Sequence, residues 1–242
     1  AVVAVVVALS VPTILCAENW DDHDRSGRYV MRDMGYNYLQ TVLPNSIIIN
    51  YGDNDSYPMW YNQEVENIRP DVRIMNQSYL GGGWYIEQMT HRLNESDPVP
   101  FSMPKSKYMF GNFDYIFIQD IVDYRVDLAQ AMAVVRSENP NTKLLLDDND
   151  PNSLAFDFLP QHKLSLPVNK ENVIKYGILD KKYEDRIPDE IVLTIPAGKD
   201  YLTKPELFML DLLSNYQWDR PINLLSMGGD INIGIKDYLM YE

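Results

Sequence analysis

The stretch that decides the fold is residues 46–76, SIIINYGDNDSYPMWYNQEVENIRPDVRIMN, in this chain of 242 residues. It opens with an Ile-rich apolar run at 47–51, passes through a Gly-Asp-Asn-Asp turn and an amphipathic segment opened by Pro58, and closes with a second β-type run at 72–75. Two short β-branched runs joined by a helix of about three turns are typical of a βαβ unit with parallel strands. The stretch therefore predicts an α/β fold.

The loop after the first predicted strand is Gly52-Asp53-Asn54-Asp55-Ser56. Ligands usually meet a parallel sheet at the loop leaving the carboxyl end of a strand. The loop has no Gly-rich phosphate fingerprint and no lysine, so it does not match dinucleotide or P-loop binding. Its carboxylates repel phosphate and suit a cation, a sugar hydroxyl or a basic group. We therefore predict that Asp53, Asn54 and Asp55 bind substrate.

The composition limits the possible classes of function. Hydrophobic residues make up 45% of the chain, enough for a real core, and the 35 acidic against 21 basic side chains give a net charge of −14. This charge argues against sequence-independent binding to nucleic acid or to anionic lipid headgroups. With Cys16 alone and three histidines, an internal disulfide and a Cys-based zinc site are excluded, and a multi-histidine metal centre is not expected. Seventeen tyrosines are compatible with carbohydrate contact but also with ordinary strands and interfaces.

Residues 1–17, AVVAVVVALSVPTILCA, contain no charge. As a helix they would be about 25 Å long, slightly short of a bilayer core. Without an initiator Met or a basic leader, they are predicted to be the end of a transmembrane segment of a longer protein rather than a complete signal peptide. The alternative is a buried strand at residues 2–9, which their β-branched content favours. In both cases Glu18 marks a boundary, with a separate domain at residues 18–242.

A charged segment comes directly after this boundary. Trp20 lies where an aromatic residue would mark the membrane surface. The acidic and basic side chains after it could bind a metal or hold a phosphate, or could form a self-paired, solvated cap. We predict that this group contacts substrate: Asp21, Asp22, His23, Asp24, Arg25 and Arg28.

The remaining pattern predicts alternating elements. Helices are expected at 29–43, 84–93, 126–135, 204–216 and 233–241, and further strands at 115–119, 164–168, 191–195 and 222–226. The acidic run at 147–150 is interpreted as a solvated turn, because it lacks the Gly and Glu positions of a calcium-binding EF-hand. Residues 191–226 form a second βαβ-like passage, so both ends of the chain are expected to contribute to one sheet. The predicted fold is a mostly parallel, Rossmann-like sheet with flanking helices, preceded by an apolar membrane-type segment.

Several long motifs carry a family resemblance: NWDDHDRSGRY (19–29), GDNDSYPMWYNQEVENIRPDVRIMNQSYL (52–80), WYIEQM (84–89), KDYLTKPELFMLDLL (199–213) and WDRPIN (218–223). Together they make the chain resemble the region after the transmembrane part of the Bacteroidota protein O-mannosyltransferase-like family. The triple glycine at 81–83 differs from the less glycine-rich link of that family. The resemblance implies a polytopic GT-C glycosyltransferase of the inner (cytoplasmic) membrane, with residues 18–242 as an extracytoplasmic α/β domain on the periplasmic side.

The resemblance also implies a reaction. Mannose would pass from a polyprenyl-phosphate donor to a Ser or Thr hydroxyl of a protein acceptor, helped by a general-base carboxylate in an early loop between membrane helices. This segment would then bind or position the acceptor, without a catalytic residue or a cofactor of its own. One alternative is a metal-dependent, nucleotide-sugar glycosyltransferase that uses the D-x-D runs Asp53-Asn54-Asp55 and Asp22-His23-Asp24. Another is a non-enzymatic binding module of the cell envelope.

Overall fold

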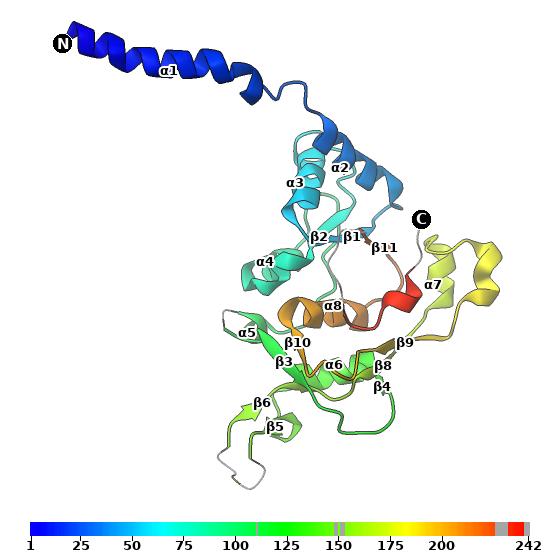
Figure 1. Ribbon diagram of the computed structural model, residues 1–242. Helices are drawn as coiled ribbons and strands as arrows, with labels where there is room; N and C mark the ends of the chain where they lie inside the picture. The colour runs from blue at the N-terminus through cyan, green and yellow to red at the C-terminus, as the bar shows by residue number, and fades with distance from the viewer. Residues whose placement is uncertain (110, 148–149, 151–152, 226–231, 240–242) are drawn as a thin grey trace.

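The computed structural model describes residues 1–109, 111–147, 150, 153–225 and 232–239 (Figure 1). Its helices, strands and 3₁₀ turns are, in chain order, α1(Val2–His23), α2(Val30–Thr41), β1(Ile47–Asn50), α3(Asp53–Glu64), β2(Arg73–Asn76), η1(Gln77–Gly81), α4(Gly83–Met89), α5(Lys105–Tyr108), β3(Tyr115–Ile118), β4(Val126–Asp127), α6(Leu128–Arg136), η2(Pro140–Thr142), β5(Leu144–Leu145), β6(Ala155–Phe156), β7(Phe158–Leu159), β8(Lys163–Pro167), α7(Lys170–Lys175), η3(Lys181–Arg186), β9(Glu190–Thr194), β10(Tyr201–Thr203), α8(Lys204–Ser214), β11(Ile222–Leu224) and η4(Lys236–Tyr238).

The βαβ unit predicted from residues 46–76 is confirmed. β1 and β2 pair in parallel, from Ile47 opposite Arg73 to Asn50 opposite Asn76, and α3 is the crossover between them. The helix begins at Asp53 and not at Pro58, so residues 53–56, predicted as part of a loop, form its first turn. β11 pairs in parallel with the other side of β1, so the sheet order is β11-β1-β2. The expectation that both ends of the chain share one sheet is therefore confirmed for this three-stranded sheet.

This parallel sheet is buried on both faces, which explains the uninterrupted apolar run in β1. On one face, Ile48 and Ile74 pack with Leu39 of α2 and Met59 of α3. On the other face, Ile47 and Ile49 belong to the large cluster that includes α8. All four residues of β1 are buried.

The expectation of one mostly parallel, Rossmann-like sheet is corrected. The other strands form three small sheets, β10-β3-β7, β4-β8-β9 and β5-β6. β8 and β9 are antiparallel neighbours, joined through α7 and η3. The passage at 191–226 is not a βαβ unit, because β9 and β11 lie in different sheets and β10 pairs with β3 before α8 begins. The fold is thus mixed α/β. Short strands with similar apolar patterns pair in different sheets, because packing against neighbouring side chains, rather than the pattern itself, decides which strands pair.

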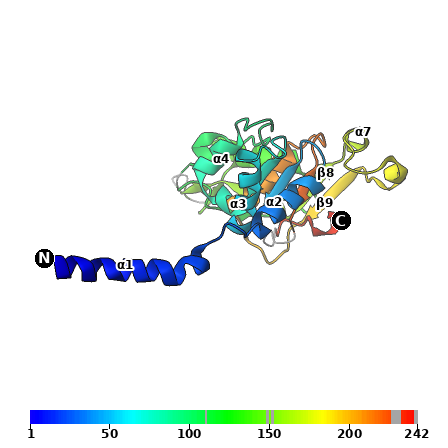
Figure 2. The same ribbon diagram turned by 90° about the horizontal axis from the view of Figure 1, so that it is seen from above.

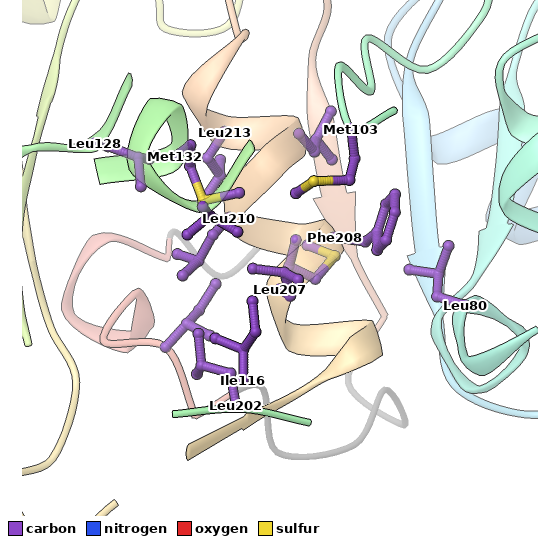
Figure 3. Close-up of a cluster of buried hydrophobic side chains, with 14 of the residues drawn as sticks. Leu80, Met103, Ile116, Leu128, Met132, Leu202, Leu207, Phe208, Leu210 and Leu213 are labelled. Carbon is purple, nitrogen blue, oxygen red and sulfur yellow. The ribbon is translucent and has the colours of Figure 1, made fainter. Parts of the chain in front are cut away.

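Helix α8 lies between the parallel sheet and the layer formed by α6 and β3 (Figure 1). Its side chains meet those of Leu128 and Met132 from α6, Ile116 from β3 and Leu80 from η1 (Figure 3). The helix begins with a capping box, in which the Glu206 carboxylate accepts a hydrogen bond from the Thr203 backbone N–H at 2.9 Å. The predicted helix at 204–216 is confirmed, with its end at Ser214.

The apolar segment at the N-terminus is helical and not a buried strand. α1 continues past the predicted boundary at Glu18 to His23, and none of its residues is buried. It points away from the rest of the chain in both views (Figures 1 and 2). Among the described residues it alone is long and apolar enough to cross a membrane, with a mean hydropathy of 2.0. These properties fit a membrane anchor or a signal sequence.

The other predicted elements vary in their agreement with the structure. Helix α2 and strand β3 are confirmed within two residues of their predicted bounds. The helix at 84–93 ends early at Met89, and the helix at 126–135 begins only after the two residues of β4. Within the described part of 233–241, only the 3₁₀ turn η4 replaces the predicted helix, and residues 240–241 lie outside the described chain. Residues 148–149 of the acidic run and residue 226 of the last strand also lie outside it.

The packing of α2 on α3 gives a first prediction. A Cβ atom added at Gly35 would lie 2.5 Å from the carbonyl carbon of Pro58, a backbone atom that cannot move without shifting α3. We expect Gly35→Ala to lower the free energy of unfolding by about 1–3 kcal/mol, as other overpacked sites do. Urea unfolding in detergent would measure this change. The matched control is Gly27→Ala, because an added Cβ there meets nothing within 4 Å. Equal stability of the two variants would contradict this account of the packing.

Candidate functional site

Three of the predicted site residues, Arg28, Asp53 and Asn54, line one cleft. The cleft has a volume of about 490 Å³ and lies between the segment entering α2 and the first turns of α3. We call it the junction cleft, because it lies where the chain passes from α1 to the domain. Its full lining is Arg28, Tyr29, Met31, Arg32, Asp53, Asn54, Tyr57, Pro58, Tyr61 and Glu66.

The two arginines of the junction cleft differ in their pairing. Arg32 donates two hydrogen bonds to the Glu66 carboxylate, from Nε at 2.6 Å and from Nη2 at 2.7 Å. These bonds raise the pKa of Arg32 and hold the pKa of Glu66 below its usual range. Arg28 is exposed and makes no ion pair within the described part of the chain. Arg28 is therefore the cation of this cleft that is available to a ligand.

Asp53 is held in place by aromatic side chains. The Tyr79 hydroxyl donates a hydrogen bond of 2.6 Å to Asp53 Oδ1, and the Tyr57 hydroxyl lies 3.2 Å from that of Tyr79. The bond to Asp53 raises the pKa of the Tyr79 phenol. Tyr79 also packs between Trp60 and Trp84, with ring centroids 6.3 Å and 6.0 Å away. Its hydroxyl thereby orients one oxygen of Asp53, while Oδ2 makes no hydrogen bond among the described residues.

Asp55 does not share the environment of Asp53. The two residues stand two apart in the first turn of α3, so their side chains point to different sides of the helix. Asp55 is only 7% exposed, and burial raises the pKa of its carboxyl. The run Asp53-Asn54-Asp55 therefore does not offer two carboxylates to one cation. Asp55 is absent from the lining of the junction cleft.

The charged residues 21–25 are not part of the lining of the junction cleft, whereas Arg28 is. Asp21, Asp22 and His23 are exposed on the last turn of α1, Asp24 caps that helix, and Arg25 is the next residue. Their contacts are local. The Asp24 carboxylate accepts the Ser26 N–H at 2.9 Å, and hydrogen bonds with Ser26 lower the pKa of Asp24. Within the described residues, no three His, Cys, Asp or Glu side chains form a group that could hold a metal ion.

The sequence analysis missed a group of buried polar residues that connects the ends of β1 and β2 to the first turn of α3. The Ser56 hydroxyl accepts hydrogen bonds from the side-chain amides of Asn50 at 2.6 Å and Asn76 at 2.9 Å. All three side chains are fully buried, so their mutual hydrogen bonds replace those lost with water. The sequence did contain a signal for this group, because an asparagine lies next to the last residue of each of the two predicted parallel strands. In the structure Asn50 and Asn76 lie opposite one another in the pairing of β1 and β2.

The tyrosines of the cleft were also missed as site residues. Tyr57 and Tyr61 stand four residues apart on α3 and therefore share one face of the helix. Both line the junction cleft, and both remain about half exposed. This spacing of two tyrosines could have been found in the sequence, but ordinary surface helices show it too.

The buried carboxyl of Asp55 gives a prediction about pH. A carboxyl whose pKa is higher in the folded than in the unfolded state binds more protons when folded, so stability falls as pH rises through that pKa. We expect Asp55→Asn to be more stable than the unsubstituted protein at pH 7, with the difference shrinking as pH falls toward the ordinary range of a carboxyl. Urea unfolding at a series of pH values measures both effects.

Asp123→Asn is the matched control, because Asp123 is exposed to solvent. The change in stability measured for this exposed position at each pH is the reference for Asp55→Asn. A loss of stability in Asp55→Asn that grows as pH rises through the carboxyl range would contradict this account, because it would show that the ionised carboxylate stabilises the fold.

Comparison with known proteins places the chain in a family. No solved structure matches it. The family model described as TMEM260-associated domain 2 matches residues 31–242, which include nearly all of α2 and every later element. The match begins after α1, so the apolar helix lies outside it. The chain therefore belongs to the TMEM260-associated domain 2 family, which links it to membrane proteins related to protein O-mannosyltransferases.

Proposed function

We propose that this chain is the extracytoplasmic, membrane-proximal domain of a polytopic GT-C glycosyltransferase of the Bacteroidota inner membrane. The whole enzyme would transfer mannose from a polyprenyl-phosphate donor to Ser or Thr of a protein, and this domain would bind and position the acceptor polypeptide. The observation that carries the proposal is the junction cleft, which joins Arg28 to Asp53 and Asn54 directly after an exposed apolar helix.

The chemistry of the junction cleft suits an extended polypeptide. Arg28 can donate hydrogen bonds to backbone carbonyl groups, and the free oxygen of Asp53 can accept one from a backbone N–H or a hydroxyl. Tyr57 and Tyr61 add amphipathic faces that can pack on side chains while remaining partly in water. A mixture of exposed aromatic rings and a few polar groups is common in peptide-binding surfaces.

The proposed division of labour leaves the chemistry outside this chain. In the transfer, the acceptor hydroxyl attacks the anomeric carbon of mannose as the bond to the lipid phosphate breaks, and a general base takes the hydroxyl proton. We propose that the base is a carboxylate in a loop between membrane helices. Arg28 and Asp53 would hold the acceptor so that its hydroxyl reaches that loop.

The nucleotide-sugar alternative has less support from the geometry. Such enzymes hold a cation between two carboxylates, whereas Asp53 and Asp55 point to different sides of α3. Asp22 and Asp24 are likewise two apart, at the end of an exposed helix. The alternative of a non-enzymatic binding module uses the same junction cleft and differs only in the absence of sugar transfer after binding.

Removal of Arg28 tests the proposed acceptor site. In the complete membrane protein, we expect Arg28→Ala to raise the KM for a Ser/Thr acceptor peptide about tenfold, the loss expected for one charge-assisted hydrogen bond. The KM for the lipid-linked mannose donor should not change. Transfer of radiolabelled mannose to the peptide measures both constants.

The matched control is Arg92→Ala, since Arg92 is also exposed and lies outside the cleft. It should leave both constants unchanged. If the two arginine variants gave the same constants, the junction cleft would not be the acceptor site. Loss of a protein partner without any loss of mannose transfer would instead favour the binding module.

The division of labour can be tested with this chain alone. We expect residues 1–242, purified in detergent, to transfer no mannose from a polyprenyl-phosphate donor to a Ser/Thr peptide. Addition of Mn²⁺ with a nucleotide-mannose donor should also give no transfer. Mass spectrometry of the peptide is the measurement. A mannosylated product with the lipid donor would place the catalytic base in this chain, and one with the nucleotide sugar would support the metal-dependent alternative.

A further inference from the structure

A second cleft lies at the carboxyl ends of the parallel strands. It has a volume of about 560 Å³, within the size range of small-molecule sites. We call it the strand-end cleft. It is lined by Tyr51, Gln77, Ser78, Gly81, Asp114, Tyr115, Thr203, Lys204, Pro205 and Glu206.

The walls of the strand-end cleft come from separate parts of the fold. Tyr51 comes directly after β1, and Gln77 and Ser78 come directly after β2. The opposite wall is the start of β3 and the first turn of α8, which packs against the same sheet. Open α/β sheets bind ligands at this edge, outside the carboxyl ends of their strands.

The charged groups of this cleft are already paired. Lys204 Nζ lies 2.8 Å from Asp114 Oδ1, and Lys199 Nζ lies 2.8 Å from Glu206 Oε1. The second oxygen of Glu206 accepts hydrogen bonds from the N–H and the hydroxyl of Thr203, each at 2.9 Å. A charged ligand would have to break one of these pairs, so the cleft suits a neutral ligand.

The groups left without partners are polar but uncharged. Gln77 is 5% exposed, and its Oε1 has no hydrogen-bond partner among the described residues. This oxygen has almost no accessible surface, so a ligand in the cleft cannot reach it, and the contacts open to a ligand are those of the exposed tyrosines. The residues Tyr51 and Tyr115 are 50% and 65% exposed, and neither hydroxyl makes a hydrogen bond within the described chain. Tyr115 is packed edge-to-face on Tyr201, with centroids 5.3 Å apart, which fixes the direction of its ring.

A neutral ligand that carries both hydroxyl groups and apolar C–H faces matches this set. A pyranose ring has these properties, because its hydroxyls donate and accept hydrogen bonds at the edge while its C–H face can lie on an aromatic ring. We propose that the strand-end cleft binds one neutral hexose unit, with the hydroxyls of Tyr51 and Tyr115 bonded to sugar hydroxyls and the ring of one of these tyrosines packing on the sugar face. This site is distinct from the junction cleft and goes beyond the proposed positioning of a polypeptide acceptor.

Titration of the whole chain with methyl α-mannoside tests the proposal. The chain is kept in a zwitterionic detergent without a sugar headgroup, and binding is followed by saturation-transfer NMR and chemical-shift changes. We expect saturation, with a Kd on the order of millimolar as for a single weak site. Glucuronate, which carries a negative charge, should bind at least tenfold more weakly. Absence of saturation by methyl α-mannoside would overturn the proposal.

Two substitutions and one control locate the site. Tyr115→Ala and Tyr51→Ala each remove an exposed ring and its unpartnered hydroxyl from the cleft. Each should weaken binding about tenfold. Tyr124→Ala is the matched control, because Tyr124 is 64% exposed and lies outside the cleft, and it should bind as the unsubstituted protein does. Folding of every variant is checked by its urea unfolding. Folded variants that all bind equally would overturn the assignment to this cleft.

The source of the sugar is resolved by three further ligands. A mannosylated Ser/Thr peptide, the same peptide without mannose, and free mannose are compared in the Arg28→Ala variant, in which peptide binding at the junction cleft is weakened. Tighter binding of the glycopeptide than of free mannose would identify protein-linked sugar as the ligand, and equal binding would identify the sugar alone. Equal affinity of this variant for the peptide with and without mannose would overturn the proposal. Arg28→Ala should not change sugar binding, because Arg28 lies in the other cleft. If no sugar binds, the proposed acceptor site is unaffected, and if Arg28→Ala does not change the KM for the acceptor peptide, the proposed sugar site is unaffected.

Discussion

Burial of α8 on all sides is the constraint on which the rest of the structure depends. All but two of its residues are buried, and they contact both the parallel sheet and the α6 layer. Its one acidic residue beyond the first turn, Asp211, is fully buried. The Asp211 carboxylate accepts hydrogen bonds from the backbone N–H groups of Ser102 at 2.7 Å and Met103 at 3.1 Å, and it forms an ion pair with Arg136 at 3.1 Å. A buried carboxylate is tolerated only with such partners. Asp211 thus fixes α8 to the loop before α5 and to α6, and this also fixes the first turn of α8 beside the strand ends.

The unit β1–α3–β2 supplies both clefts. The loop after β1 turns into α3, whose first turns form one wall of the junction cleft. The ends of β1 and β2 themselves form a wall of the strand-end cleft through Tyr51 and Gln77. The buried side-chain amides of Asn50 and Asn76 both donate to the Ser56 hydroxyl, so the carboxyl ends of β1 and β2 are bonded to the first turn of α3. Asn50 Oδ1 has no hydrogen-bond partner among the described atoms.

The parts of the fold that could be predicted are those set by local pattern. The apolar runs and the N-cap at Thr203 predicted β1, β2 and α8 to within two residues, whereas α3 begins at Asp53, five residues before the predicted start at Pro58. Strand pairing, in contrast, could not be predicted from local sequence patterns. β9 has the same apolar character as β11, yet it pairs with β8, and only the packed structure distinguishes the two choices. Likewise, Asp53 and Asp55 were equivalent in the sequence, but the start of α3 turned one toward Tyr79 and buried the other.

The net charge of the chain illustrates why composition does not describe a site. With a charge of −14, an acidic surface would be expected to repel anions everywhere. In the strand-end cleft, however, each lining lysine or carboxylate is matched by an opposite charge at 2.8 Å, and in the junction cleft Arg28 is a free cation within the described chain. The turn η1 touches both sites, since it gives Gln77 to one and the Tyr79 hydroxyl to Asp53 of the other. The five residues of η1 therefore connect the walls of the two clefts. What each cleft can bind is determined by the charges of its own lining residues and not by the net charge of the chain.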